Sequence, residues 1–174
     1  MKYPQLLLLI ALALLSVVQA AWQQFQLPAL VAVHFNAAGQ ANGWMTRAYF
    51  LGYELAFTLG TSAIFAAFAF LTSALPAALI PLPHKEYWLA PERSGEARRR
   101  LAGMVLASGC GAVAFFIFLH QLLYQANLER RHGFSPPPGV VITVAVVLVA
   151  GPVIRPLARF SRTPAPPAPP PRRR

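Results

Sequence analysis

The sequence predicts an all-α integral membrane protein with four transmembrane helices and a compact extracytoplasmic loop between the first and the second. Of its 174 residues, 56% are hydrophobic and only 11% are charged, whereas a soluble domain carries about 25% charged residues. The apolar residues fall into long runs instead of alternating patterns, which is typical of segments that cross a bilayer. The chain has no Asp and a single Cys. This composition excludes Asp-based catalytic triads and zinc cages built from several thiolates.

Four apolar stretches approach the roughly 20 residues that a helix needs to cross about 30 Å of hydrocarbon. Pro76 marks the expected end of the second stretch. The fourth is short and rich in β-branched residues, but a helix is still favoured because a lipid-exposed backbone must satisfy its own hydrogen bonds. The predicted spans are 4–21, 48–75, 101–124 and 139–154. Together they form a transmembrane domain over residues 1–157, and the Pro- and Arg-rich residues 158–174 are expected to be a disordered cytoplasmic tail.

The first span has an alternative interpretation as a cleaved secretory signal. Lys2 precedes its apolar core, and Val18-Gln19-Ala20 fits a cleavage site with small residues before the cut. Both interpretations leave residues 22–47 outside the cytoplasm, so the topology downstream does not depend on the choice.

The distribution of basic residues predicts the orientation, because positively charged loops stay in the cytoplasm. Twelve Lys and Arg residues lie in the N-terminus, the loop 81–100 and the C-terminal part, whereas the loops 22–47 and 125–138 hold three. We therefore expect both termini in the cytoplasm and the loops 22–47 and 125–138 outside it. The net charge of +10 is explained by topology, and no folded basic domain remains to bind nucleic acid.

The loop 22–47 combines strand-like and turn-forming residues. Apolar residues alternate from Val31 to Phe35 as in a short strand, while Gly39 and Asn42-Gly43 are residues that favour turns. Trp22 and Trp44 flank the loop and suit the membrane interface. We expect a compact cap held against the bilayer.

The same loop carries a motif with a known counterpart. Its residues are Leu27-Pro28, Val33-His34-Phe35-Asn36, Gly39 and Asn42-Gly43-Trp44, with Arg47 shortly after. This string resembles the signature of the bacterial membrane family named domain of unknown function 1648, and residues 82–93 resemble the cytoplasmic loop of some members. The family includes the toxin-immunity and signalling membrane protein of a Bacillus cannibalism system. The resemblance therefore implies the topology above and a location in the inner membrane of a bacterium, and it is compatible with a signalling or immunity-like role.

In the loop before the third span, Pro91 suits the first turn of a helix in which Glu96 and Arg100 lie four residues apart. This helix is expected to continue into the third span. Arg98, Arg99 and Arg100 would then lie at the level of anionic headgroups. A signal that orients the helix is favoured there over specific recognition of a lipid or partner.

Glu54 is the one acid inside a predicted span, and an ionisable group there is a candidate functional residue. The topology places His120 in the same leaflet, together with Gln19, Gln121 and Gln125. We hypothesise that Glu54 and His120 form a proton-responsive pair. Ordinary packing with interfacial hydration is the alternative.

His34 has no Cys, carboxylate or second His in its loop. A structural histidine that donates to the loop backbone beside Asn36 is therefore favoured over a metal ligand assisted by Glu129 and His132. Two small-residue ladders permit close helix approach, each against a different helix or a partner. They are Gly52, Ala56 and Gly60 in the second span and Gly103, Ala107 and Gly111 in the third.

These features favour a small non-enzymatic membrane protein that acts by interaction or sensing. A small proton-linked transporter or permeation protein using Glu54 and His120 is the alternative. The expected partners are the lipid bilayer and either another membrane protein or an extracytoplasmic peptide. No nucleic acid, metal or cofactor is expected. The interaction residues are expected among Pro28, His34, Phe35, Asn36, Gly39, Asn42, Gly43 and Trp44.

Overall fold

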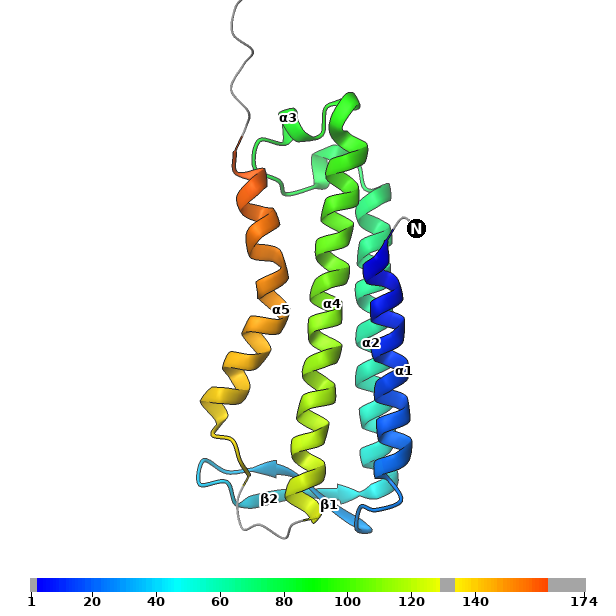
Figure 1. Cartoon of the computed structure of the whole chain (residues 1–174), viewed down its shortest axis with the longest axis vertical. Coiled ribbons are helices and arrows are strands. Elements are labelled where there is room, and N and C mark those ends of the chain that lie inside the picture. The colour runs from blue at the N-terminus through cyan, green and yellow to red at the C-terminus, as the bar shows by residue number, and fades with distance from the viewer. Residues whose placement is uncertain (1–2, 129–133, 163–174) are drawn as a thin grey trace, which may run out of the picture.

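The computed structural model describes residues 3–128 and 134–162. Four helices in this part of the chain are long and apolar enough to cross a membrane (Figure 1). They are α1 (Pro4–Gln23), α2 (Arg47–Ala74), α4 (Pro91–Leu128) and α5 (Pro138–Phe160). The predicted fold of four apolar helices is confirmed, and the chain has the architecture of a multi-pass membrane protein. Residues 1–2, 129–133 and 163–174, which include His132, Glu129 and most of the predicted tail, lie outside the described residues.

The two ends of the helix assembly carry different structures. A hairpin of β1 (Leu30–Phe35) and β2 (Ala41–Thr46) crosses one end, called the hairpin end below (Figure 1). The 3₁₀ helix η1 (Ala77–Leu79) and the short helix α3 (Lys85–Trp88) lie at the opposite end. Because Arg98, Arg99 and Arg100 are also there, it is called the arginine end.

The helix α4 extends well beyond the predicted span 101–124. It begins at Pro91, where a proline suits the first turn, and Arg100 forms an ion pair with Glu96. Its 38 residues correspond to roughly 57 Å, against about 30 Å of hydrocarbon. The expectation that the helix beginning near Pro91 continues into the third span is therefore confirmed.

The hairpin differs from the sequence prediction in its turn. Gly39, with φ at 79°, lies in the turn between the strands, as expected. Asn42-Gly43 was predicted to form a turn, and this is wrong, because both residues lie within β2. Gly43 instead pairs with His34 at an irregular point of the register, where a Cβ on Gly43 would lie 2.9 Å from the Cβ of His34. The glycine is needed for close strand approach.

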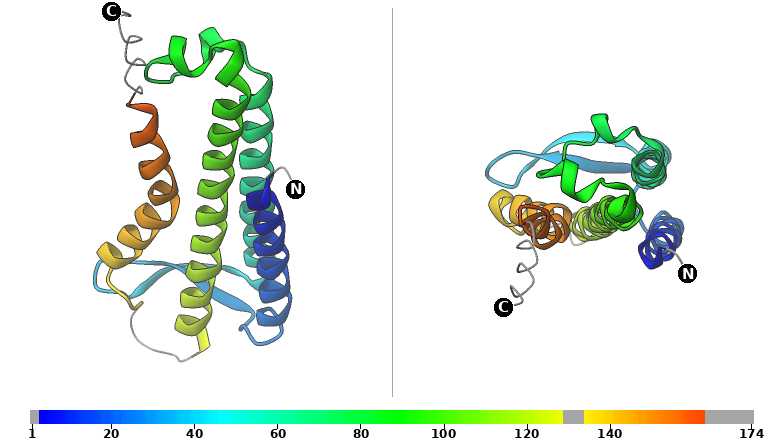
Figure 2. Two further views of the ribbon diagram at one scale, coloured as in Figure 1. Left: turned by 45° about the horizontal axis from the view of Figure 1, so that its top comes forward. Right: turned by 90° about the horizontal axis from the view of Figure 1, so that it is seen from above.

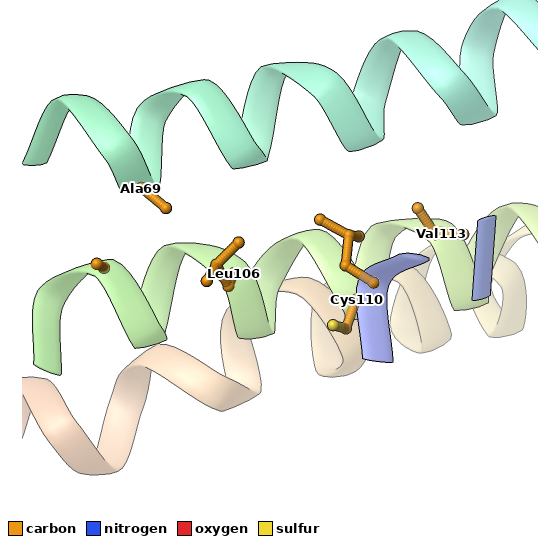
Figure 3. Close-up of a cluster of buried hydrophobic side chains, with 6 residues drawn as sticks. Ala69, Leu106, Cys110 and Val113 are labelled. Atoms are coloured by element: carbon orange, nitrogen blue, oxygen red, sulfur yellow. The ribbon is translucent and has the colours of Figure 1, made fainter. Parts of the chain in front are cut away.

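The helix α4 is the centre of the assembly, with α1, α2 and α5 packed around it (Figure 2). A core cluster joins α1, α2 and α4, and Figure 3 shows Ala69 pointing from α2 toward α4, where Leu106 and Val113 lie. Gly109 permits the approach of α2, because a Cβ there would meet the Cβ of Phe65 at 2.7 Å. Cys110 is buried in the same cluster.

The helix α5 approaches α4 closely near its middle and is farther from it toward both ends (Figure 1), although its last residue, Phe160, is buried in a cluster with Ala97 and Met104 of α4. Pro152 has no N–H, so the carbonyl of Leu148 lacks its donor within the helix. This carbonyl faces Gly111, where an added Cβ would lie 1.9 Å from the Leu148 oxygen. Beside it, the Ser108 hydroxyl donates to the Val149 carbonyl at 2.8 Å. The divergence leaves a cavity of about 490 Å³ at the hairpin end and one of about 910 Å³ at the arginine end.

Candidate functional site

Glu54 and His120 meet in the interior, near the hairpin end of α2 and α4. The carboxylate oxygen Oε1 and the ring nitrogen Nδ1 lie 2.7 Å apart, and the two residues are 3% and 6% exposed. The contact is an ion pair by distance, but it lacks the alignment of a good hydrogen bond, and neither atom has a better-aligned partner among the described residues. The predicted proximity of these two residues is thus present.

Aromatic rings enclose the pair. Phe116 stacks on the His120 ring with 6.2 Å between the centroids, and Phe50 meets the same ring edge-on at 6.3 Å. These walls keep the imidazole and the carboxylate in a low-dielectric environment, where their interaction is stronger than in water. An imidazole and a carboxylate at this separation can share or exchange one proton.

A second set of polar side chains lies between α1 and the helices α2 and α4. The hydroxyls of Ser16 and Thr58 are buried and lie 3.1 Å apart. Gln121 Oε1 accepts from Gln19 at 3.3 Å and from Gln23 at 2.9 Å. The Oε1 atoms of both α1 glutamines are buried without a partner among the described residues.

Sequence reasoning identified Gln19 and Gln121 but missed Ser16, Gln23 and Thr58. The spacing of Ser16, Gln19 and Gln23 by three and four residues places them on one face of α1. This spacing could have identified the polar face of α1 from the sequence. Gln125, expected in the same group, is exposed and has no hydrogen bond to the other members of the group.

The cap is held by polar residues of its own motif and of α4. Asn36 Oδ1 accepts from the backbone N–H groups of Ala38 and Gln40, which forms the turn. His34 contacts the side chain of Asn42 and does not donate to the backbone beside Asn36 as expected. Asn127 on α4 accepts from the N–H of Ala32 at 2.8 Å and donates to its carbonyl at 2.9 Å. Asn127 was not predicted, because nothing in the sequence shows that α4 reaches the hairpin.

Half of the motif lines the cavity of about 490 Å³ at the hairpin end. His34, Phe35, Asn36 and Gly39 contribute to it from the hairpin. The remaining walls are largely apolar and come from α4, from α5 and from the segment before α5, with Leu119, Leu123, Phe134, Val141 and Ile142. Pro28, Asn42, Gly43 and Trp44 do not line it. Within the described ranges, no three His, Cys, Asp or Glu side chains come together as metal ligands.

Comparison with known proteins gives a match to one family over part of the chain. Neither a curated protein nor a solved structure matches the chain. Residues 9–52 match the family described as "Domain of unknown function (DUF1648)". This segment contains most of α1, the whole hairpin and the first turns of α2, whereas Glu54 and His120 lie outside it. The resemblance predicted from the sequence is confirmed: over residues 9–52, this chain resembles the DUF1648 family.

Proposed function

We propose that this is a small non-enzymatic protein of the bacterial inner membrane that acts by sensing or interaction. In the proposed orientation, both termini lie in the cytoplasm and the hairpin end lies outside, as the distribution of basic residues predicts. The cap binds an extracytoplasmic peptide or a segment of another membrane protein. The observation that carries this proposal is the cavity of about 490 Å³ between the motif-bearing hairpin and the diverging ends of α4 and α5.

The chemistry of this cavity suits an apolar segment with a polar backbone. Its walls are mainly aliphatic and aromatic, while His34 and Asn36 supply a small number of polar groups. Binding sites in proteins commonly have this composition, with volumes of roughly 300–1,000 Å³. An apolar side chain of the partner fits against Leu123 and Ile142, and the ring of His34 is placed to bind its backbone, whereas the Asn36 side chain is engaged in the turn.

The hairpin is also coupled to the spanning helices, as a sensor requires. The strand β2 ends at Thr46 and α2 begins at Arg47, without an intervening loop. Arg47 donates from Nη1 to the carbonyl of Leu27 at 3.0 Å, and Asn127 joins Ala32 to α4. A displacement of the cap therefore acts directly on α2 and α4, the helices that carry Glu54 and His120.

Photo-crosslinking in native membranes tests the binding proposal. A photoreactive phenylalanine analogue at Ala38, which lines the cavity, is compared with the same analogue at the exposed Ala29, which does not. We expect one defined adduct, identified by mass spectrometry, from position 38 only. Filling the cavity by Ile142→Trp should abolish this adduct. Identical adducts from both positions, or adducts that persist in the filled variant, would contradict the proposal.

A second function is favoured by the Glu54–His120 pair, namely proton-linked transport. The two groups lie 2.7 Å apart in the interior of the helix assembly, where a buried carboxylate and imidazole can pass a proton. The test is proton flux through the full chain in liposomes. Flux that is lost in Glu54→Gln but kept in Glu92→Gln, which removes an exposed carboxylate at the arginine end, supports transport. Flux no greater than in protein-free liposomes contradicts it.

A further inference from the structure

A second cavity lies at the arginine end, at the opposite end of the helix assembly from the cap. It measures about 910 Å³ and is bounded by the start of α1, by α4 and by the kinked part of α5. The helix α5 packs mainly on α4, with α1 and α5 flanking α4 (Figure 2), and residues of all three helices line the cavity. It is the counterpart, at the other end of α5, of the cavity under the hairpin.

The mouth of this cavity is positively charged. Arg99, Arg100 and Arg159 line it, and Glu96, which pairs with Arg100, is the one acid among the lining residues that the structure describes. The neighbouring Arg98 has a different role. Its Nη1 donates to the carbonyls of Thr72 and Leu75 at the end of α2, at 3.1 and 2.6 Å. Arg98 therefore holds two helices together, whereas Arg99 has no hydrogen bond to another described residue and remains available to a ligand.

The floor of the cavity is apolar. Gly103 and Ala107 lie one turn apart on α4 and form a shallow surface, which Met104, Pro152 and Pro156 complete. Only the Gln5 side chain approaches Gly103 from another helix, at 3.6 Å from the position of a Cβ. The cavity thus pairs a cationic mouth with an apolar floor, and this combination fits an amphiphile with an anionic head.

The level of the arginines along the helices identifies the amphiphile. The apolar stretch of α4 begins at Leu101, directly after Arg100, and α1 begins its own apolar run at Pro4. Arg99 and Arg100 therefore lie where the helices leave the hydrocarbon and meet lipid phosphates. Basic pockets between spanning helices bind anionic headgroups. We propose that this cavity binds one anionic phospholipid, with its phosphate at Arg99 and Arg159 and an acyl chain against Gly103 and Ala107.

Native mass spectrometry of the full chain in detergent tests this site. The probes are dioleoylphosphatidylglycerol and the neutral dioleoylphosphatidylcholine. We expect preferential retention of the anionic lipid, and a loss of about fivefold in its affinity in Arg99→Gln, since each arginine near the headgroups contributes about that factor. Arg162→Gln removes the same charge from an exposed position that does not line the cavity, and should change the affinity by less than about twofold.

A charge-neutral pair of variants tests the acyl-chain part. Gly103→Leu fills the floor and should reduce retention of the anionic lipid, whereas Gly95→Leu, on the same helix with open space around it, should not. Equal retention of the two lipids, or equal losses in Arg99→Gln and Arg162→Gln, would overturn the proposal. Displacement of the lipid by soluble glycerol phosphate at similar concentration would also overturn it, because the site would then recognise a phosphate without a chain.

Discussion

The α1–α2–α4 unit and the helix α5 are held in the molecule by different kinds of contact. In the most apolar stretches of α1, α2 and α4, 22%, 11% and 50% of the residues are buried, whereas in that of α5 none are. The first unit is joined by contacts between polar side chains, including Glu54 with His120 and Ser16 with Thr58. At its middle, α5 contacts α4 where the Leu148 carbonyl lies against Gly111. One hydrogen bond, from the Ser108 hydroxyl to the Val149 carbonyl, also joins the two helices there.

This difference explains where the cavities are. Side-chain polar contacts within α1–α2–α4 require close packing along most of the helices, which leaves little space for a ligand. The helix α5 crosses α4 at its middle, is kinked by Pro152 and Pro156, and has one further buried contact at Phe160, so it can diverge on both sides of the crossing. Both proposed binding sites lie in the space that this divergence opens. The variants below test the contrast, in order of decreasing expected effect.

The largest effect is expected from His120→Ala. A polar contact between membrane helices contributes only about 0.6 kcal/mol on average, but this variant leaves a buried carboxylate without its partner, which costs about 3–5 kcal/mol. The free energy of unfolding in detergent measures the loss. Replacing both residues by apolar ones, in Glu54→Met with His120→Leu, should be much less harmful. A double variant as unstable as His120→Ala would show that the loss does not come from an unpaired buried carboxylate.

Gly111→Ala should disturb the contact between α4 and α5 and lower the free energy of unfolding by about 1–3 kcal/mol, the usual cost of overpacking. The added Cβ would lie 1.9 Å from a backbone oxygen and 2.5 Å from its carbon, so the helix α5 itself must move. The loss is measured as a change in the free energy of unfolding, and lipid retention should fall in the same variant. An Ala at this position without any loss would mean that α5 is not seated at Gly111.

Removing one hydroxyl should cost about 0.6 kcal/mol in either region. Ser16→Ala breaks the contact with Thr58 between α1 and α2, and Ser108→Ala breaks the bond to Val149 between α4 and α5. A double-mutant cycle of Ser16→Ala with Thr58→Val isolates the first contact. If Ser108→Ala lowers the free energy of unfolding several times more than Ser16→Ala does, then the packing of α5 depends on one hydrogen bond. The difference between α5 and the α1–α2–α4 unit would then be larger than expected.

The smallest effect is expected from Gly60→Ala. No atom lies within 4 Å of a Cβ at this position, and the same holds for Gly52. A gain of about 0.5 kcal/mol is expected, because Ala has less conformational freedom to lose in a helix than Gly. The free energy of unfolding in detergent measures this gain, and Gly111→Ala, which is expected to lose stability, is the comparison variant. A loss in Gly60→Ala would indicate that another molecule packs on this face of α2.

Much of the architecture follows from residue patterns that act locally. Runs of apolar residues predicted the four helices, and Pro91 with Glu96 and Arg100 predicted the long extension of α4. Glu54 and His120 were paired from topology alone, because α2 and α4 run in opposite directions through the same thickness. Asn42-Gly43 was assigned to a turn by local preference, but cross-strand packing against His34 placed it in a strand.

The two glycine ladders show what the local pattern leaves open. Both have the same spacing, yet Gly52 and Gly60 have open space around them, while Gly111 meets the backbone of α5. In the second ladder, Gly103 and Ala107 line a cavity instead of a helix contact. Spacing identifies a helix face, whereas the identity of the neighbour depends on how all four helices are arranged.

The sequence by itself determined that the chain crosses the membrane, how many helices do so and which residues are polar inside it. These properties depend on the cost of exposing charge or unpaired backbone to hydrocarbon, which is additive along the chain. The tertiary structure decided that α4 is the central helix, that Asn127 holds the hairpin and that α5 is seated at Gly111. These features depend on contacts between residues that are far apart in the sequence. The cavities lie where the helices no longer contact one another closely.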